Sequence, residues 1–176
     1  DAAAAARPRE DFAERMRAAL LDSVSHHLLA DVPIGAFLSA GVDSGALVGL
    51  ARDAGLGQAR TVTLAYDEFQ GRASDEAPLA ERTARRYEAL HTTRRVSAAE
   101  FKSDLPKILQ AMDQPSIDGI NTWFVSKAAR ELGLKVALSG VGGDELLGGY
   151  STFRTLTALV RWTRLAPHLS ALSGPL

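Results

Sequence analysis

The sequence predicts an α/β fold: a mostly parallel sheet with helices on both faces. Helix-like and strand-like segments alternate along the chain, and the strand-like segments are short apolar runs that lead into glycine-rich or polar loops. Parallel strands need a crossover connection between them, which the intervening helices supply. With 176 residues, 46% of them hydrophobic, the chain is long enough to bury a hydrophobic core.

The first elements follow from hydrophobic spacing. Apolar residues at helical intervals predict an amphipathic helix over 11–29. A short buried strand over 34–38 then leads into a helix over 44–54, which Gly55 ends as a C-cap.

The later elements continue the alternation. β-branched residues at alternate positions predict a second strand over 61–66, followed by a polar loop over 67–74. Pro78 is compatible with a helix over 76–87, because proline fits the first turn. The remaining predicted elements are a strand over 91–96, helices over 98–112 and 122–132, and a strand over 135–138.

The most informative segment joins the strand ending at residue 38 to the helix that follows it. Its loop of small residues, Ser39-Ala40-Gly41-Val42-Asp43-Ser44, offers backbone N–H groups and two hydroxyls beside the positive end of a helix dipole, which favours phosphate binding. The Asp43 carboxylate would repel a phosphate unless a cation lay between them. It therefore indicates Mg²⁺ bound together with a polyphosphate.

A second glycine-rich block, Ser139-Gly140-Val141-Gly142-Gly143-Asp144, follows the last predicted strand. Ligands of parallel sheets bind beyond the carboxyl ends of strands near a switch in strand order, so we expect both blocks at one edge. No Gly-Lys-Ser/Thr follows either block, which excludes a Walker A loop, and the second block lacks the third glycine of a dinucleotide fingerprint. Alternatively, Asp43 and Asp144 are helix N-caps.

Together the two blocks resemble the synthetase domain of the asparagine synthetase family. Residues 39–44 are similar to the Ser-Gly-Gly-x-Asp-Ser pyrophosphate loop of ATP pyrophosphatases, and 138–150 resemble the Ser-Gly-Glu-Gly-x-Asp-Glu-x-x-Gly-Gly-Tyr signature of asparagine synthetases and relatives such as β-lactam synthetases. The first block alone leaves argininosuccinate, GMP and NAD synthetases and tRNA-thiolating enzymes open. The resemblance covers residues 32–153 and implies a Rossmann-like, adenine nucleotide α-hydrolase-like fold.

The resemblance implies ATP and Mg²⁺ as cofactors of an amide-forming ligase. An aspartate-like acid would attack the α-phosphate of ATP to give an acyl-adenylate and pyrophosphate, and ammonia or an amine would then displace AMP. Asp43 and Asp144 would hold Mg²⁺ on the β- and γ-phosphates, and Leu38 and Leu64 would line the adenine pocket. The nucleotide positions that the resemblance assigns are Leu38, Ser39, Ala40, Gly41, Val42, Asp43, Ser44, Leu64, Ser139, Gly140 and Gly142.

Other polar residues match the family pattern less closely. Asp75 and Glu76, in the acidic loop after the second strand, either contact ligand or metal or cap the following helix. By the same resemblance, the residues that fall near the acid substrate are Asp113, Gln114, Pro115 and Asn121.

The sequence also departs from the family pattern. Ala40 stands where most relatives have glycine, and if that position needs a positive φ its methyl group costs about 1–2 kcal/mol and weakens nucleotide binding. Val141 replaces the glutamate that is a candidate general base, so no catalytic residue is assigned. Residues 151–176 contain no lysine, where relatives supply lysines to the phosphates. The alternative function is therefore a non-catalytic nucleotide-binding or scaffolding module.

The domain and partner predictions follow from these matches. We expect residues 1–10 to be disordered or a linker, 11–165 to form an ATP pyrophosphatase domain that is incomplete at its C-terminal end, and 166–176 to be a tail. The expected partners are a small-molecule acid, ammonia or an amine, a glutaminase domain in the full-length protein, and a second copy of the chain bound through exposed apolar surface.

Composition excludes several other classes. A net charge of −1 without a basic patch argues against nucleic-acid binding, including an RNA-modifying role, and no apolar run reaches the ~18 residues of a membrane span. The absence of cysteine excludes disulfides and thiol catalysis and agrees with a cytoplasmic location. The four histidines lack metal-ligand spacing.

Overall fold

The computed structural model describes residues 9–116 and 118–170. The chain forms two compact units, Asp1–Gly140 and Val141–Leu176. Residues 1–8 of the predicted linker and 171–176 of the predicted tail lie outside the described residues, whereas Arg9 and Glu10 belong to the first helix and 166–170 to the last.

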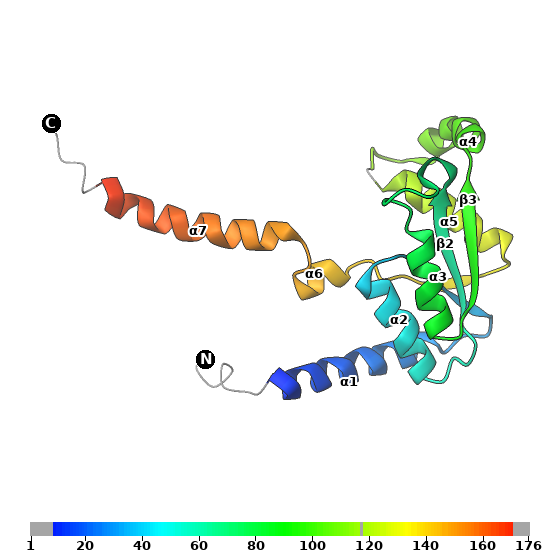
Figure 1. The fold of residues 1–176 in the computed structure, drawn as a ribbon, viewed down its shortest axis with the longest axis horizontal. Coiled ribbons are helices and arrows are strands. Elements are labelled where there is room, and N and C mark those ends of the chain that lie inside the picture. The colour runs from blue at the N-terminus through cyan, green and yellow to red at the C-terminus, as the bar shows by residue number, and fades with distance from the viewer. Residues whose placement is uncertain (1–8, 117, 171–176) are drawn as a thin grey trace. The chain divides into compact units, whose positions relative to one another are not determined.

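The first unit alternates helices and strands as the sequence predicts (Figure 1). Each predicted helix and strand is present, with bounds within three residues of those expected. A short 3₁₀ turn, η2 (Asp67–Phe69), lies in the predicted polar loop after the second strand. The elements in order are α1 (Arg9–His27), β1 (Ile34–Phe37), α2 (Val42–Asp53), β2 (Arg60–Tyr66), α3 (Ala77–Arg86), β3 (Leu90–Val96), α4 (Ala98–Ala111), α5 (Gly119–Glu131) and β4 (Val136–Leu138).

The four strands form one parallel sheet in the order β3-β2-β1-β4. The chain runs outward from β1 to β3 and then returns to the other side of β1, so the switch in strand order lies between β1 and β4. Ala36 is in register with Leu138, the last residue of β4, and Phe37 is in register with Val62. The loops after β1 and β4 therefore begin side by side at the carboxyl edge.

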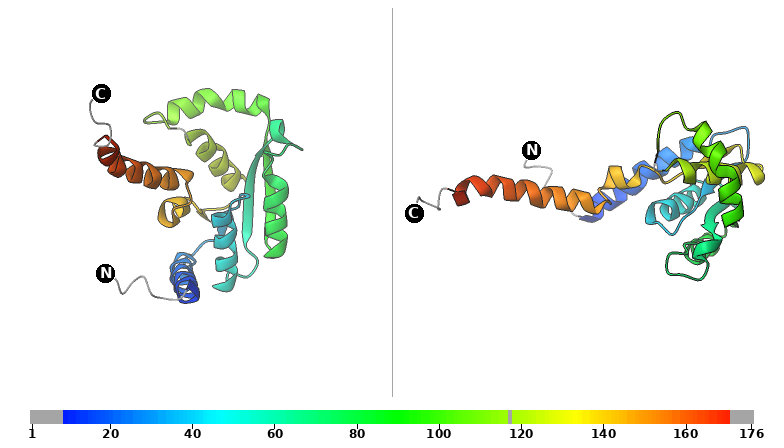
Figure 2. Two further views of the ribbon diagram at one scale, coloured as in Figure 1. Left: turned by 60° about the vertical axis from the view of Figure 1, so that its left-hand side comes forward. Right: turned by 90° about the horizontal axis from the view of Figure 1, so that it is seen from above.

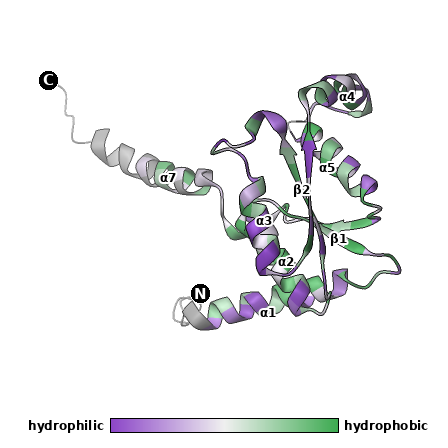
Figure 3. Ribbon diagram, turned by 45° about the vertical axis from the view of Figure 1, so that its right-hand side comes forward, coloured by the Kyte–Doolittle hydropathy of each residue, from purple (hydrophilic) through white to green (hydrophobic). Residues whose placement is uncertain are grey.

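Helices cover both faces of this sheet, which confirms the predicted fold class (Figure 2). On one face α1, α2 and α3 pack on β1 through a cluster that includes Val24, Val48 and Ala84. On the other face a cluster of Val96, Ile108 and Phe124 joins α4 and α5 to the strands. Figure 3 shows β1 as hydrophobic, as expected of a central strand covered on both sides, whereas α1 alternates hydrophobic and hydrophilic residues.

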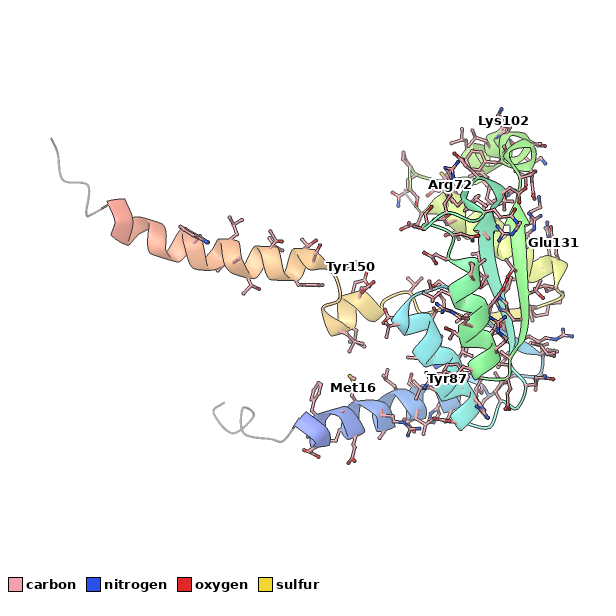
Figure 4. All side chains as sticks on the ribbon, viewed as in Figure 1. Met16, Arg72, Tyr87, Lys102, Glu131 and Tyr150 are labelled. Atoms are coloured by element: carbon pink, nitrogen blue, oxygen red, sulfur yellow. The ribbon has the colours of Figure 1, made fainter. Side chains whose placement is uncertain are left out.

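Two glycines of α2 face the α3 segment. A Cβ atom at Gly45 would lie 3.4 Å from Thr83, and one at Gly49 would lie 2.9 Å from the ring of Tyr87. Figure 4 labels Tyr87 at the end of α3 beside α2. Position 45 faces residue 83 and position 49 faces residue 87, so a step of four along one helix matches a step of four in the same direction along the other. The two helices therefore run parallel, and their N-terminal ends lie near each other at the carboxyl edge of the sheet.

An ionic network ties α4 and α5 to β3. The ammonium group of Lys127 lies 2.6 Å from both a Glu100 and an Asp104 oxygen, and Arg94 pairs with Glu100 and Glu131. Hydrogen bonds, first from Arg94 and then from Lys127, lower the pKa of Glu100 to about 2. The Lys127 hydrogen bond is the main cause that holds the pKa of Asp104 well below its usual range.

The second unit contains α6 (Gly143–Leu147) and α7 (Ser151–Ser170). Helix α6 lies where Asp144 was the alternative N-cap, whereas α7 lies in residues 151–176, for which no element was predicted. Among the helices of the described ranges, none has the length and apolar character needed to cross a bilayer.

We expect Lys127→Gln to lower the melting temperature by a few degrees at pH 7, because it leaves two carboxylates without their shared cation. Both carboxyl groups have a lowered pKa in the folded state, so their contribution is present above about pH 4 and is lost as the pH falls through their folded values. The difference from wild type should therefore shrink towards pH 2. Thermal unfolding followed by circular dichroism at several pH values measures it.

Lys102→Gln, on the same helix α4 and outside this network, is the matched control (Figure 4). It removes the same charge and should change the melting temperature little at either pH. An equal effect of the two substitutions at pH 7 would contradict the role given to the network.

Candidate functional site

The carboxyl end of β1 is fixed by hydrogen bonds to β2. The Leu38 N–H donates to the Val62 carbonyl at 2.9 Å, and the buried Thr63 hydroxyl donates to the Leu38 carbonyl. Residue 38 is therefore the last position held by the sheet, and the loop of residues 39–44 starts from a rigid point.

The two serine hydroxyls brace this loop from inside. The Ser39 N–H donates to Ser44 Oγ at 3.1 Å, the Gly41 N–H donates to Ser39 Oγ at 3.1 Å, and the two hydroxyl oxygens lie 2.9 Å apart. The sequence had suggested that these hydroxyls and N–H groups face a ligand. They bond to each other because half-buried N–H groups need an acceptor, which leaves the loop pre-shaped.

The donors that face outward are those of the first turn of α2. Gly41 is the N-cap residue and no side chain caps the helix, so Asp43 is not an N-cap. The first amide with an intrahelical partner is that of Gly45, which donates to the Gly41 carbonyl at 3.3 Å. The amides of Val42, Asp43 and Ser44 therefore remain as the anion-binding end of the helix.

Ala40 causes no backbone strain. Among the described residues, the one non-glycine residue with a positive φ is Glu88, at 55°. The predicted penalty of a methyl group in the left-handed region therefore does not apply to Ala40, and its weakening of nucleotide binding is not expected on that ground.

The loop after β4 touches the first turn of α2. A Cβ atom on Gly140 would lie 2.9 Å from the Ser44 nitrogen and 3.2 Å from the Asp43 carbonyl carbon. These neighbours are backbone atoms, which cannot move aside as a flexible side chain would. A side chain at position 140 would therefore clash, and Ser139 and Gly140 follow β4 beside the loop of residues 39–44.

Three glycines of the second unit shape the surroundings of Asp144. Gly142 has φ +97° and is the N-cap of α6, and Gly148 has φ +70° at its C-cap, both in the left-handed region. A Cβ atom on Gly149 would lie 1.8 Å from Asp144 Oδ1, so the glycine leaves the room that this carboxylate occupies. Because Gly142 is the N-cap, Asp144 is not.

In and after the second glycine-rich block, Val141, Glu145 and Tyr150 are exposed. Val141 is 92% exposed, and the Tyr150 hydroxyl donates to Glu145 Oε1 at 2.8 Å. Asp43 belongs to the first compact unit and Asp144 to the second. That the two carboxylates share one Mg²⁺ stays a prediction.

Leu38 and Leu64, both assigned to the adenine pocket, do not lie side by side. Leu38 is buried in the cluster on the α1, α2 and α3 face, whereas Leu64 packs on the cluster of the α4 and α5 face. The cause is the register, since Leu38 aligns with Thr63 and neighbouring residues of a strand point to opposite faces. That both leucines contact adenine stays a prediction.

Asp75 has a structural role. Its side chain, 4% exposed, accepts the N–H groups of Gly71 and Ala77 and pairs with Arg95 at 3.2 Å. These bonds lower the pKa of Asp75 despite its burial. The carboxylate joins the loop after β2 to the start of α3, as the helix-capping alternative predicts, although Glu76 takes the N-cap position itself.

Glu76 reaches the loop of residues 39–44. Its Oε2 accepts the N–H of Ala40 at 3.3 Å, a contact between residues 36 positions apart that the sequence pattern gave no means of finding.

The residues expected near the acid substrate lie beyond the end of β2. The Tyr66 hydroxyl donates to Asn121 Oδ1 at 2.8 Å, and burial raises the pKa of Tyr66. Asp113, Gln114 and Pro115 are exposed in the connection between α4 and α5. This places Asn121, on the first turns of α5, at the same edge of the sheet as the loop after β1.

A cavity of about 250 Å³ lies at the opposite end of the strands, where β2 and β3 begin. It is not part of the candidate site, which is built at the carboxyl ends. Among the described residues, no three His, Asp or Glu side chains are grouped so that they could hold a metal ion. The cavity is lined by Arg60, Thr61, Leu90, His91, Thr92, Leu132 and Leu134.

Comparison with known proteins identifies related sequences and a solved structure of similar fold. The asparagine synthase family model matches residues 15–174. Asparagine synthetase [glutamine-hydrolyzing] 1 of Bacillus subtilis is 34% identical over 162 residues, which cover 91% of this chain and 25% of that protein. A putative asparagine synthetase [glutamine-hydrolyzing] of Mycobacterium tuberculosis is 39% identical over 143 residues, 80% of this chain and 21% of that protein. The chain thus spans about a quarter of the length of these relatives.

Among solved structures, the NH₃-dependent NAD synthetase of Campylobacter jejuni is similar, with a TM-score of 0.50 and 16% identity. The match covers 78% of this chain and 60% of that chain. It supports the fold alone.

We expect Gly140→Ala to destabilise the first unit by about 1–3 kcal/mol, because the added methyl group meets backbone atoms of Asp43 and Ser44. Gly45→Ala is the matched control, since its methyl group would meet Thr83 at an ordinary contact distance at the end of the first turn of α2. The control should be neutral or stabilising by up to about 1 kcal/mol. Chemical denaturation measures both, and equal stability of the two variants would contradict the close approach of the two loops.

Proposed function

This chain belongs to the asparagine synthase family, and we propose that it is the nucleotide-binding part of a ligase that forms an amide through an acyl-adenylate, converting ATP to AMP and pyrophosphate. The observation that carries the proposal is the contact of Gly140 with the first turn of α2, which joins two glycine-rich loops at the switch point of the sheet. Sites at such switch points bind nucleotides in many α/β proteins.

The triphosphate would lie at the N-terminal end of α2. The amides of Val42, Asp43 and Ser44 have no intrahelical partner there, and the helix dipole favours an anion. Gly140 leaves the backbone accessible because it has no side chain to fill the space above Ser44. The serine hydroxyls, bonded to each other, hold the loop in this shape before the nucleotide arrives.

Mg²⁺ fits the residues present. Asp43 is half-buried on the first turn of α2, and the Asp144 carboxylate occupies room that exists because position 149 is glycine. Two carboxylates together with phosphate oxygens are the oxygen ligands that Mg²⁺ prefers. When bound, the ion would neutralise charge on the triphosphate.

The proposed reaction has two steps. A carboxylate oxygen of the acid substrate bonds to the α-phosphorus, and pyrophosphate leaves. The nitrogen of ammonia or an amine then bonds to the acyl carbon, AMP leaves, and the nitrogen loses a proton. Positioning and charge neutralisation supply most of the rate enhancement in such transfers. The acid would approach past Asn121, which the Tyr66 hydroxyl holds.

Val141 limits the nitrogen donor. Valine accepts no proton, so the side chain at this position gives no help in deprotonating an amine. Ammonia reacts as the free base, which makes it the donor that suits this chain. A glutaminase domain elsewhere in the full-length protein would supply it, and the reaction would take place in the cytoplasm.

A non-catalytic nucleotide-binding or scaffolding module is the second candidate. The exposed valine at position 141 favours it, since the family's candidate base is missing there. The presence of Asp43, Ser44, Asp144 and Glu145 favours the enzyme.

Asp43→Asn and Asp144→Asn should each abolish the dependence of ATP binding on Mg²⁺. Wild-type chain should bind ATP at least about tenfold more tightly with Mg²⁺ than with a chelator, and each variant should lose that factor, worth about 1.4 kcal/mol. Isothermal titration calorimetry measures it.

Asp53→Asn, at the other end of α2, is the matched control and should retain the Mg²⁺ effect, because its carboxylate pairs with Arg17 far from the loop. If both loop variants kept the wild-type Mg²⁺ dependence, the metal assignment would be wrong.

The two candidate functions differ in turnover. With the full gene product, ATP, Mg²⁺, an acid such as aspartate and ammonia or an amine, we expect pyrophosphate, AMP and the amide in equal amounts, whereas without a nitrogen donor pyrophosphate should form without the amide. A screen over acids and amines with coupled pyrophosphate detection tests this. ATP binding without release of pyrophosphate for any pair would favour the scaffolding module.

A further inference from the structure

Glu76 places an acidic group on the phosphate-binding loop. Its Oε2 accepts the N–H of Ala40 at 3.3 Å, while the neighbouring N–H groups of Ser39 and Gly41 are held by serine hydroxyls. The Ala40 amide is thus the one of these three loop amides that bonds to a side chain from another element. A carboxylate there occupies a position that suits any anion.

The fold fixes where Glu76 starts. Glycines 45 and 49 let α2 and α3 run parallel in close contact, so the first residues of α3 lie beside the loop that opens α2. Asp75, buried and bonded to Gly71, Ala77 and Arg95, anchors the backbone immediately before Glu76. The backbone at residue 76 is therefore held.

The Glu76 side chain, by contrast, is free to rotate away. The residue is exposed, and the long contact to Ala40 is the hydrogen bond that the structure gives its carboxylate among the described residues. An exposed side chain changes rotamer in nanoseconds or less, so this contact breaks without any movement of helix or loop.

We propose that Glu76 determines how tightly the site holds a polyphosphate, by competing with a phosphate group for the Ala40 N–H. This inference rests on the proposed function, since it takes the loop after β1 to be the phosphate site. Bound pyrophosphate or ATP displaces the carboxylate, which then repels the phosphates at short range. The residue thereby weakens binding of the pyrophosphate product and favours its release.

A metal-binding role for Glu76 would predict the opposite change in binding affinity. If Glu76 were a ligand of Mg²⁺, neutralising it would weaken binding in the presence of the metal. Competition with phosphate predicts tighter binding, with or without Mg²⁺, when the charge is removed.

The test titrates pyrophosphate into the full chain by calorimetry, with Mg²⁺ and with a chelator. Glu76→Gln keeps the length of the side chain and an oxygen acceptor but removes the charge. We expect it to bind pyrophosphate about three- to tenfold more tightly than wild type at low salt, with a smaller gain at high salt. Glu14→Gln, an exposed residue on α1, removes the same charge elsewhere and should match wild type.

Amide hydrogen exchange gives a readout that does not depend on nucleotide. In the absence of pyrophosphate, Glu76→Ala should make the Ala40 amide exchange faster than in wild type, and Glu14→Gln should leave it unchanged. Unchanged exchange in Glu76→Ala would overturn the contact on which the proposal rests.

The binding outcomes separate the two proposals. Equal or weaker binding by Glu76→Gln, with wild type still binding pyrophosphate, overturns the role of Glu76 and leaves the proposed function standing. No binding of pyrophosphate by either protein contradicts the proposed function and, with it, the competition.

Discussion

The close approach of the loop after β4 to the first turn of α2 is the constraint on which the candidate site depends. Ala36 of β1 and Leu138 of β4 are in register, so the loops after these two strands leave the sheet close to each other at its carboxyl edge. The second loop then passes so near Ser44 that a single methyl group on Gly140 would lie 2.9 Å from its nitrogen. Parallel strand order brings the loops to one edge, and the missing side chain allows the backbones to meet.

Acidic side chains gather near the loop after β1. The described residues of the loop after β1 carry Asp43, and Glu76 reaches the same loop from α3. The nearby Arg95 is paired with Asp75 and so is already neutralised. The partial positive charge of the α2 N-terminus offsets only part of the negative charge of Asp43 and Glu76. The proposed Mg²⁺ would offset the remaining negative charge when a triphosphate binds.

Most of the fold could be predicted from the sequence because it depends on local signals. The strand at 34–37 is a buried apolar run, and Gly55, predicted as the C-cap of α2, is the residue after the observed C-cap Ala54 and has φ +92°. Both glycine-rich blocks were found from their residue types alone. Helix α7 (Ser151–Ser170) was not predicted.

The details of the site could not be predicted in the same way. The inward bonds of Ser39 and Ser44 depend on how tightly the loop turns, and the contact of Glu76 with Ala40 depends on the packing of α2 on α3. Leu38 and Leu64 face opposite sides of the sheet because of strand register. These are tertiary relationships between residues far apart in the chain, which residue type and spacing do not encode.

The central claim is that the two loops share one metal ion over the phosphates of ATP. Paramagnetic broadening by Mn²⁺ bound with ATP measures this directly, because Mn²⁺ takes the same oxygen ligands as Mg²⁺ and broadens the NMR signals of nearby amides. We predict that the amide signals of Asp43 and Asp144 disappear together at one equivalent of Mn²⁺, while that of Asp53 remains. Loss of the Asp43 signal with Asp144 unaffected would contradict the shared site.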